Sequence, residues 1–214
     1  MDRIEERSFL ATMAVLVGLE LASSFVYGLH WARGVSPLAW TAMVRSLDIL
    51  LFFLLFRIFS VPLAAAGLQR PVMGAGAGLA VSVVLGMGFF LALFTIRSLW
   101  GPDLRVFVDP GLEVRRPGAL VVLCILGPFA EEIFFRGLCY GVIRVHLGVW
   151  PSTVISAFLF GAVHLVGGGF SAMAVPLAGG IVLALLYEFA GSLVAPSVLH
   201  GAANLILFSG ILWT

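Results

Sequence analysis

Six polar side chains interrupt the apolar segments of the second half of the chain, and their types could together carry out hydrolysis. Residues of this kind inside membrane-spanning segments usually face the interior of a helix bundle and mark a functional site. Three of them lie in the stretch "PFAEEIFFRGLCYG", one in "FGAVH" and two in "HGAAN". They are Glu131, Glu132, Arg136, His164, His200 and Asn204.

The spacing of the three charges in the first stretch predicts two different roles. Glu132 and Arg136 are four residues apart, so they can form an ion pair along one face of a helix. Glu131 is turned by about 100° from Glu132 and need not share its partner. The pair can be a purely structural contact that fixes helix packing, or it can support a site in which Glu131 acts.

The remaining residue types supply the other parts of a hydrolytic site. A carboxylate beside an imidazole, here Glu131 with His164, can take a proton from water. His200 and Asn204 are also four residues apart, and they can donate hydrogen bonds to the oxyanion of a tetrahedral intermediate. Alternatively, Glu131, His164 and His200 could hold Zn²⁺ with an open position for water. Residue types alone leave both possibilities open, and no Ser, Thr or Cys has the surroundings of a nucleophile.

Composition places these residues in a membrane protein. The 214-residue chain is 61% hydrophobic and only 11% charged, whereas soluble domains have roughly 25% charged residues. The net charge of +1 leaves no basic surface for nucleic acid, because binding to phosphates needs many cations. All twelve basic residues are Arg, which we interpret as a hint of a bacterial source.

Hydrophobic segments long enough to cross a bilayer predict an all-α bundle of seven membrane spans. A span needs about 20 mostly apolar residues, and the second region would supply an eighth span if it is a pair. Residues 97–117 form the one substantial polar connection, and residues 1–214 make a single membrane domain. The expected spans are 9–28, a segment within 38–66, 72–96, 118–142, 150–166, 170–190 and 193–213.

Several features outside the motifs have structural interpretations. Gly74 and Gly78 have the spacing of small residues at a close helix contact. Glu20, Arg45 and Asp48 could form a second polar cluster inside the spans, which we interpret as a structural ion pair. The start of the chain does not have the pattern of a cleaved signal peptide, because acidic residues accompany its arginines, so we expect a retained first span.

The three motifs together resemble those of a known protease family. "EEIFFRG" matches the EExxxR signature of the CPBP (CaaX protease and bacteriocin-processing, or Abi) intramembrane proteases, "FGAVH" matches FxxxH and "HGAAN" matches HxxxN. They occur in the family's order on three separate predicted spans, within about residues 118–208. The residues before 118 carry no motif of the family.

The resemblance implies an endopeptidase that cuts near the C-terminus of a membrane-attached protein or peptide. It implies that Glu131 and His164 activate the attacking water, that His200 and Asn204 stabilise the oxyanion, and that Glu132 and Arg136 organise the site. We favour a glutamate-type mechanism that requires no cofactor, with zinc as the alternative. In a bacterium, the expected function is the processing of C-terminal anchors or sorting signals, or a bacteriocin-related cleavage. The expected location is the cytoplasmic membrane.

Two other classes of function fit some of the same residues. A proton-coupled transporter also uses buried Glu and His residues, but it predicts internal symmetry between two halves. The polar residues here concentrate in the C-terminal half, which counts against that class. A non-catalytic immunity or scaffold protein predicts that alanine at His164 and His200 leaves the phenotype intact.

Overall fold

The fold is an all-α bundle, as the composition predicts. The computed structural model describes residues 3–28, 34–100 and 117–208, and within these ranges the chain is helical with no strand. Among the described residues, five helical segments are long and apolar enough to cross a membrane, and two shorter apolar helices accompany them. The five are Glu5–Tyr27, Pro37–Ile58, Leu63–Gly88, Gly118–Leu147 and Met173–Ala190, and the shorter two are Val149–Val163 and Val194–Phe208.

The predicted spans correspond in order to these helical segments. The region expected within 38–66 contains one long helix followed by a single 3₁₀ turn, so it supplies one span and not two. The polar connection expected at 97–117 begins later than predicted, because α3 continues to Trp100. Residues 101–116 of that connection, and residues 209–213 of the last expected span, lie outside the described residues. The elements are α1 (Arg3–Gly28), α2 (Pro37–Ile58), η2 (Leu63–Ala66), α3 (Pro71–Trp100), α4 (Pro117–Val121), η4 (Val122–Leu126), α5 (Gly127–Glu132), η5 (Ile133–Tyr140), α6 (Gly141–Leu147), α7 (Val149–Val163), α8 (Leu165–Ala190) and α9 (Val194–Phe208).

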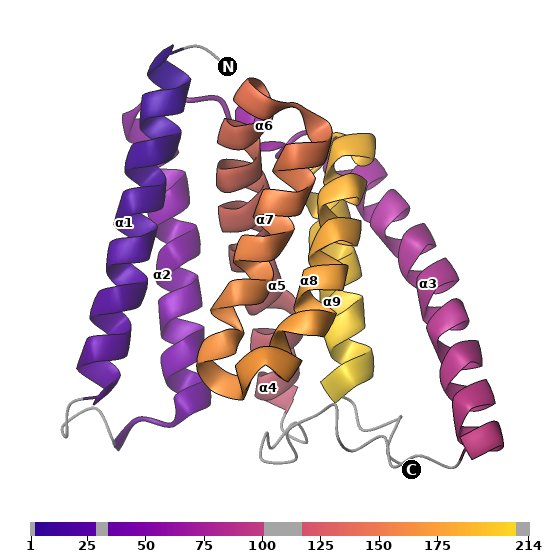
Figure 1. The fold of residues 1–214 in the computed structure, drawn as a ribbon. Coiled ribbons are helices and arrows are strands. Elements are labelled where there is room, and N and C mark those ends of the chain that lie inside the picture. The colour runs from indigo at the N-terminus through magenta and orange to yellow at the C-terminus, as the bar shows by residue number, and fades with distance from the viewer. Residues whose placement is uncertain (1–2, 29–33, 101–116, 209–214) are drawn as a thin grey trace.

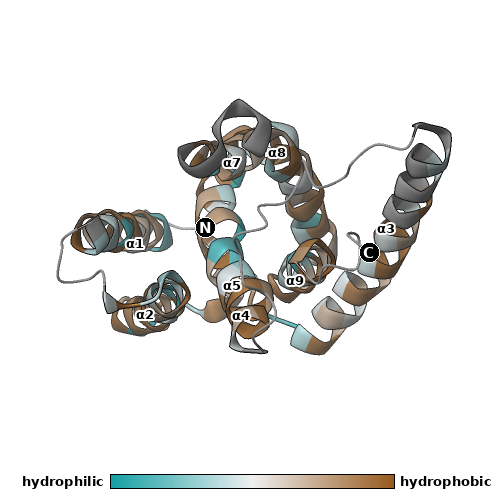
Figure 2. Ribbon diagram, turned by 90° about the horizontal axis from the view of Figure 1, so that it is seen from below, coloured by the Kyte–Doolittle hydropathy of each residue, from teal (hydrophilic) through white to brown (hydrophobic). Residues whose placement is uncertain are grey.

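The helices arrange themselves around the continuous segment α4–α6, which carries the EExxxR motif. Helices α1 and α2 lie side by side at one edge, α7 and α8 form a second pair, and α9 lies between the motif segment and α3 (Figures 1 and 2). Helix α3 is tilted away from the rest of the bundle (Figure 1). The motif segment therefore contacts both the N-terminal pair and α9, which carries the HxxxN motif.

Two glycines allow α3 to approach α9 closely. A Cβ added at Gly74 would lie 2.2 Å from Ser192 Oγ, and one at Gly78 would lie 2.5 Å from the backbone oxygen of Ala195. Both distances are far below ordinary contact, so larger residues would separate the helices. The close packing predicted from the "GAGAG" spacing is confirmed.

Two apolar clusters hold the motif segment in place. The larger one joins α1, α2 and η5 through residues such as Phe9, Phe52 and Ile133, all of them buried. The smaller one joins η5, α7, α8 and α9 directly beside the polar residues. Its members are Phe135, Phe160, Leu183 and Leu199. Burial on both sides fixes the rotation of the motif segment and hence the direction of its charged side chains.

Candidate active site

The motif segment is not a regular α-helix. Two π-helical stretches, η4 and η5, flank the short α-helix α5 that ends at Glu132. Such wide turns shift the side chains that follow them and occur frequently at functional sites. Here they place Glu131 and Glu132 at the junction between α5 and η5.

Glu132 and Arg136 form the ion pair that their spacing predicts. Arg136 Nη1 lies 3.0 Å from Glu132 Oε1, and both side chains are fully buried. Arg136 Nη2 donates a second hydrogen bond, of 3.0 Å, to the backbone oxygen of Gly180 in α8. Its guanidinium carbon also lies 4.7 Å from the ring centre of Phe160 in α7, a distance suited to a cation–π contact. Arg136 therefore ties the motif segment to two other helices.

His200 completes this buried group. Its Nδ1 lies 2.9 Å from Glu132 Oε1, the same oxygen that accepts from Arg136. Because an ionised carboxylate only accepts hydrogen bonds, the proton of this contact belongs to Nδ1. The other ring nitrogen, Nε2, lies 3.8 Å from Glu131 Oε2. Glu132 thus orients the imidazole so that its second nitrogen is directed at Glu131.

The two adjacent glutamates have different surroundings, as their angular separation predicts. The side chain of Glu132 is completely buried, whereas that of Glu131 is 26% exposed. Glu132 is committed to two protein partners through one oxygen. Glu131 can therefore meet water or a substrate while Glu132 cannot.

His164 lies at the turn between α7 and α8, one turn after Phe160. Its Nδ1 lies 2.8 Å from the backbone oxygen of Phe160, to which it donates, so Nε2 remains available as a proton acceptor. The Phe160 ring packs edge-on against both imidazoles, with ring centres 5.1 Å from His164 and 5.5 Å from His200. Between the described side chains of Glu131 and His164 there is no hydrogen bond or ion pair. Their cooperation on one water stays a prediction.

Asn204 lies one turn after His200 on α9 and contacts the motif segment. Its Nδ2 donates a 2.8 Å hydrogen bond to the backbone oxygen of Leu123 in η4. Gly201, between the two motif residues, makes this approach possible, because a Cβ there would lie 2.3 Å from the backbone oxygen of Cys124. An amide NH₂ has two N–H groups, so Asn204 retains one for another acceptor.

The structure thus brings together Glu131, Glu132, Arg136 and His200, and it places His164 and Asn204 at the margins of this group. Sequence reasoning missed the backbone oxygens of Gly180 and Leu123, because carbonyl groups have no signature in a sequence. It also missed Gly201, although a glycine at this position within "HGAAN" could have indicated a close helix contact. In the described part of the chain, no group of three or more His, Cys, Asp or Glu side chains is arranged to hold a metal ion. The zinc alternative stays a prediction.

The arrangement defines the class of the molecule: a multi-helix membrane protein with a buried carboxylate–imidazole site among apolar helices. Comparison with known families then narrows the class. Residues 114–206 match the model of a family described as type II CAAX prenyl endopeptidase Rce1-like. The family predicted from the three motifs is confirmed for this part of the chain, and it is a family of CAAX-type intramembrane proteases. No match was found among curated proteins or among solved structures.

Proposed function

We propose that the protein is an intramembrane endopeptidase that hydrolyses a peptide bond near the C-terminus of a membrane-attached protein or peptide. The observation that carries the proposal is the chain of contacts from Arg136 through Glu132 to His200, with Glu131 beyond it at 3.8 Å. A site of fixed donors and one accessible carboxylate, enclosed by apolar helices, suits the stabilisation of a developing charge.

In the proposed reaction, Glu131 acts as the general base, assisted by His164. The Glu131 carboxylate takes a proton from water, and the water oxygen attacks the carbonyl carbon of the scissile bond. A new C–O bond forms while the carbonyl oxygen becomes an oxyanion. When this intermediate collapses, the C–N bond breaks and the leaving nitrogen receives the proton that water lost. One water is consumed for each bond cut, and no external oxidant or reductant is needed.

His200 and Asn204 would stabilise the oxyanion, and the geometry specifies how. Since His200 Nδ1 donates to Glu132, only Nε2 can contact the substrate. Nε2 can donate to an oxyanion only when it carries a proton, that is, when His200 is an imidazolium. The Glu132 carboxylate at 2.9 Å is placed to support that charge. Asn204 would use the N–H that Leu123 leaves free.

Glu132 and Arg136 would organise the site without touching the substrate. Both side chains are fully buried, and the same Glu132 oxygen that accepts from Arg136 lies 2.9 Å from His200 Nδ1. These contacts support a role in which Glu132 fixes the orientation of His200.

The natural substrate that we propose is a C-terminally anchored or sorted bacterial protein, or a bacteriocin-related peptide, in the cytoplasmic membrane. The test is reconstitution of purified protein in liposomes with membrane-anchored peptides that carry a tag at each end. Mass spectrometry of the products should show one cut close to the C-terminus. The His200→Gln variant, with its fold checked by thermal unfolding, should release little of this fragment. If the wild type and the His200→Gln variant released equal amounts of the C-terminal fragment, the assignment of the active site would be rejected.

A further inference from the structure

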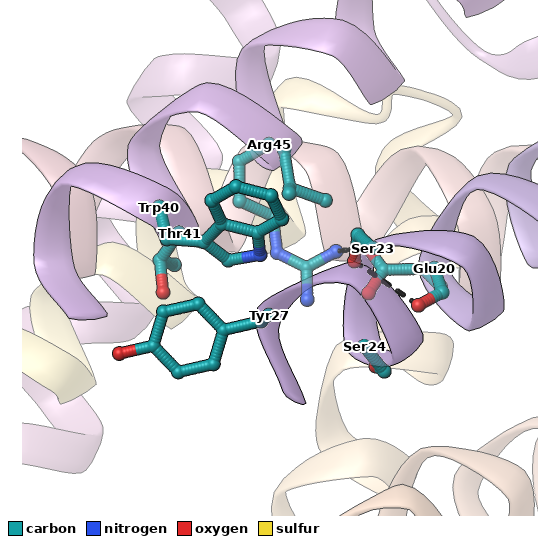
Figure 3. Close-up of a pocket in the computed structure, with 8 residues that line it drawn as sticks. Glu20, Ser23, Ser24, Tyr27, Trp40, Thr41 and Arg45 are labelled. Carbon is teal, nitrogen blue, oxygen red and sulfur yellow. Dashed lines mark hydrogen bonds and ion pairs between the residues drawn. The ribbon is translucent and has the colours of Figure 1, made fainter. Parts of the chain in front are cut away.

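Two polar groups lie inside the helix bundle, and they differ in what they connect. In the first, Arg45 contacts Glu20, and its Nη1 lies 2.9 Å from Asp48 Oδ2. The ion pair expected from the sequence is confirmed and includes all three residues. Figure 3 shows Arg45 beside Glu20 in the wall of a cavity of about 170 Å³. Among the described residues, the hydrogen bonds of Arg45 join only α1 and α2.

The second group, around Arg136, extends from α8 into the candidate active site. Arg136 Nη2 donates a 3.0 Å hydrogen bond to the backbone oxygen of Gly180 in α8. Arg136 Nη1 lies 3.0 Å from Glu132 Oε1. The same Glu132 oxygen lies 2.9 Å from His200 Nδ1. A continuous chain of three hydrogen bonds therefore leads from a carbonyl group of α8 to an imidazole of the site.

The orientation of the Arg136 guanidinium depends on the first bond of this chain. A guanidinium is planar, and the directions of its N–H groups are fixed relative to one another. The bond from Nη2 to Gly180 therefore limits the direction in which Nη1 points. The Phe160 ring, whose centre lies 4.7 Å from the guanidinium carbon, restricts the plane further. The position of the α8 carbonyl thus helps to determine how Arg136 approaches Glu132.

Gly180 can present its carbonyl to Arg136 because α7 and α8 pack closely at this glycine. Gly180 is buried, and a Cβ added there would lie 2.9 Å from the Cα of Ala157 in α7. Ordinary contact begins at 3.4 Å, so a methyl group would have to move away from α7 by about 0.5 Å. The neighbouring Gly179 has open space around it. Helix α8 therefore has room for a methyl group at one glycine and not at the next.

We propose that Gly180 is a positioning residue of the enzyme. Its backbone oxygen holds Arg136 so that Glu132 keeps the Nδ1–H of His200, and the Nε2 of that ring stays directed at Glu131. The inference rests on the proposed function, because the orientation of His200 affects the rate only if His200 acts in the reaction. None of the three motifs includes a residue of α8, so this assigns a part of the catalytic arrangement to a helix without a motif residue.

Alanine at the two adjacent glycines tests the proposal, with Gly179→Ala as the matched control. We expect Gly180→Ala to lower kcat at least about tenfold, because small displacements of catalytic groups strongly reduce the rate. KM should change little, since substrate binding does not depend on this bond. Gly179→Ala should keep the wild-type kcat. A well-folded Gly180→Ala variant with the wild-type kcat would overturn the proposal.

Proton NMR of the His200 ring gives a readout that does not require substrate. A proton on Nδ1 that is hydrogen-bonded to a buried carboxylate exchanges slowly with water, and its absence in His200→Gln identifies the signal. We expect the signal in the wild type and in Gly179→Ala, and a shifted or weakened signal in Gly180→Ala. An unchanged signal in Gly180→Ala would limit Gly180 to helix packing and overturn the proposal. The expected response without any proteolysis by the wild type would support the positioning of His200 and reject the proposed function.

Arg136→Lys tests the same bond from the other side, in case Gly180→Ala does not fold. Lysine keeps a positive charge beside Glu132, but its single nitrogen does not reproduce the fixed fork of arginine. We expect a loss of kcat and a change in the His200 proton signal of the kind predicted for Gly180→Ala. A folded Arg136→Lys variant with the wild-type kcat and an unchanged signal would overturn the proposal.

Discussion

Replacing Arg136 by methionine should destabilise the protein strongly, because the substitution removes the arginine partner of the buried Glu132 carboxylate and leaves only its contact with His200. Both side chains are fully buried, and the guanidinium also bonds Gly180 and covers the Phe160 ring. Removal of one partner from a buried ion pair costs about 3–5 kcal/mol. Methionine keeps most of the apolar volume, so the loss reports the charge and its hydrogen bonds and not a cavity.

Equilibrium unfolding in mild detergent measures this loss, and a second pair in the same protein provides the control. Arg144 pairs with Glu188 at 2.9 Å, but the two side chains are 40% and 25% exposed. Arg144→Met should therefore cost much less than Arg136→Met. Adding Glu132→Gln to Arg136→Met should recover part of the stability, because the buried charge is then gone. Equal losses of unfolding free energy in Arg136→Met and Arg144→Met would refute the description of the Glu132–Arg136 pair. So would a double variant that is no more stable than Arg136→Met alone.

Three further predictions concern α9 and the mechanism. Gly201→Ala should destabilise the protein by about 1–3 kcal/mol, because the added methyl group clashes with the backbone oxygen of Cys124. Gly179 has open space around it, so Gly179→Ala is the control and should be neutral or slightly stabilising. Equal unfolding midpoints for the two variants would contradict this packing. Asn204→Ala should lower kcat by a factor of about 10²–10³ if the Asn204 amide stabilises the oxyanion. An unchanged kcat would show that Asn204 has only a structural role, its hydrogen bond to the backbone oxygen of Leu123. Dialysis against a chelator should leave activity unchanged in the glutamate-type mechanism, and a loss that Zn²⁺ restores would establish the metal alternative.

The sequence predicted the membrane class, the order of the spans and the buried ion pair because each depends on composition or on local spacing. The pairing of Glu132 with Arg136 needs only a helix, and the contact of Gly74 and Gly78 needs only small residues at a regular interval. Both features could therefore be predicted from the spacing of residues along the sequence, without knowledge of the three-dimensional fold.

The partner of His200 was not predictable in the same way. The resemblance directed attention to Glu131, whereas the shortest contact of His200 is with Glu132, 68 positions earlier in the chain. The rotation of the motif segment determines which of the two glutamates contacts His200 on α9. The π-helical turns on both sides of α5 set that rotation. Hydrophobic periodicity does not reveal such turns.

The most direct test of the account is the rate of peptide hydrolysis by Glu131→Gln. Glutamine keeps the size of the side chain and removes the base, while the buried pair of Glu132 and Arg136 is untouched. We predict that kcat falls by about 10²–10⁴, the usual contribution of a general base, with an unchanged unfolding midpoint. Cleavage at the wild-type rate would contradict the central claim that Glu131 activates water.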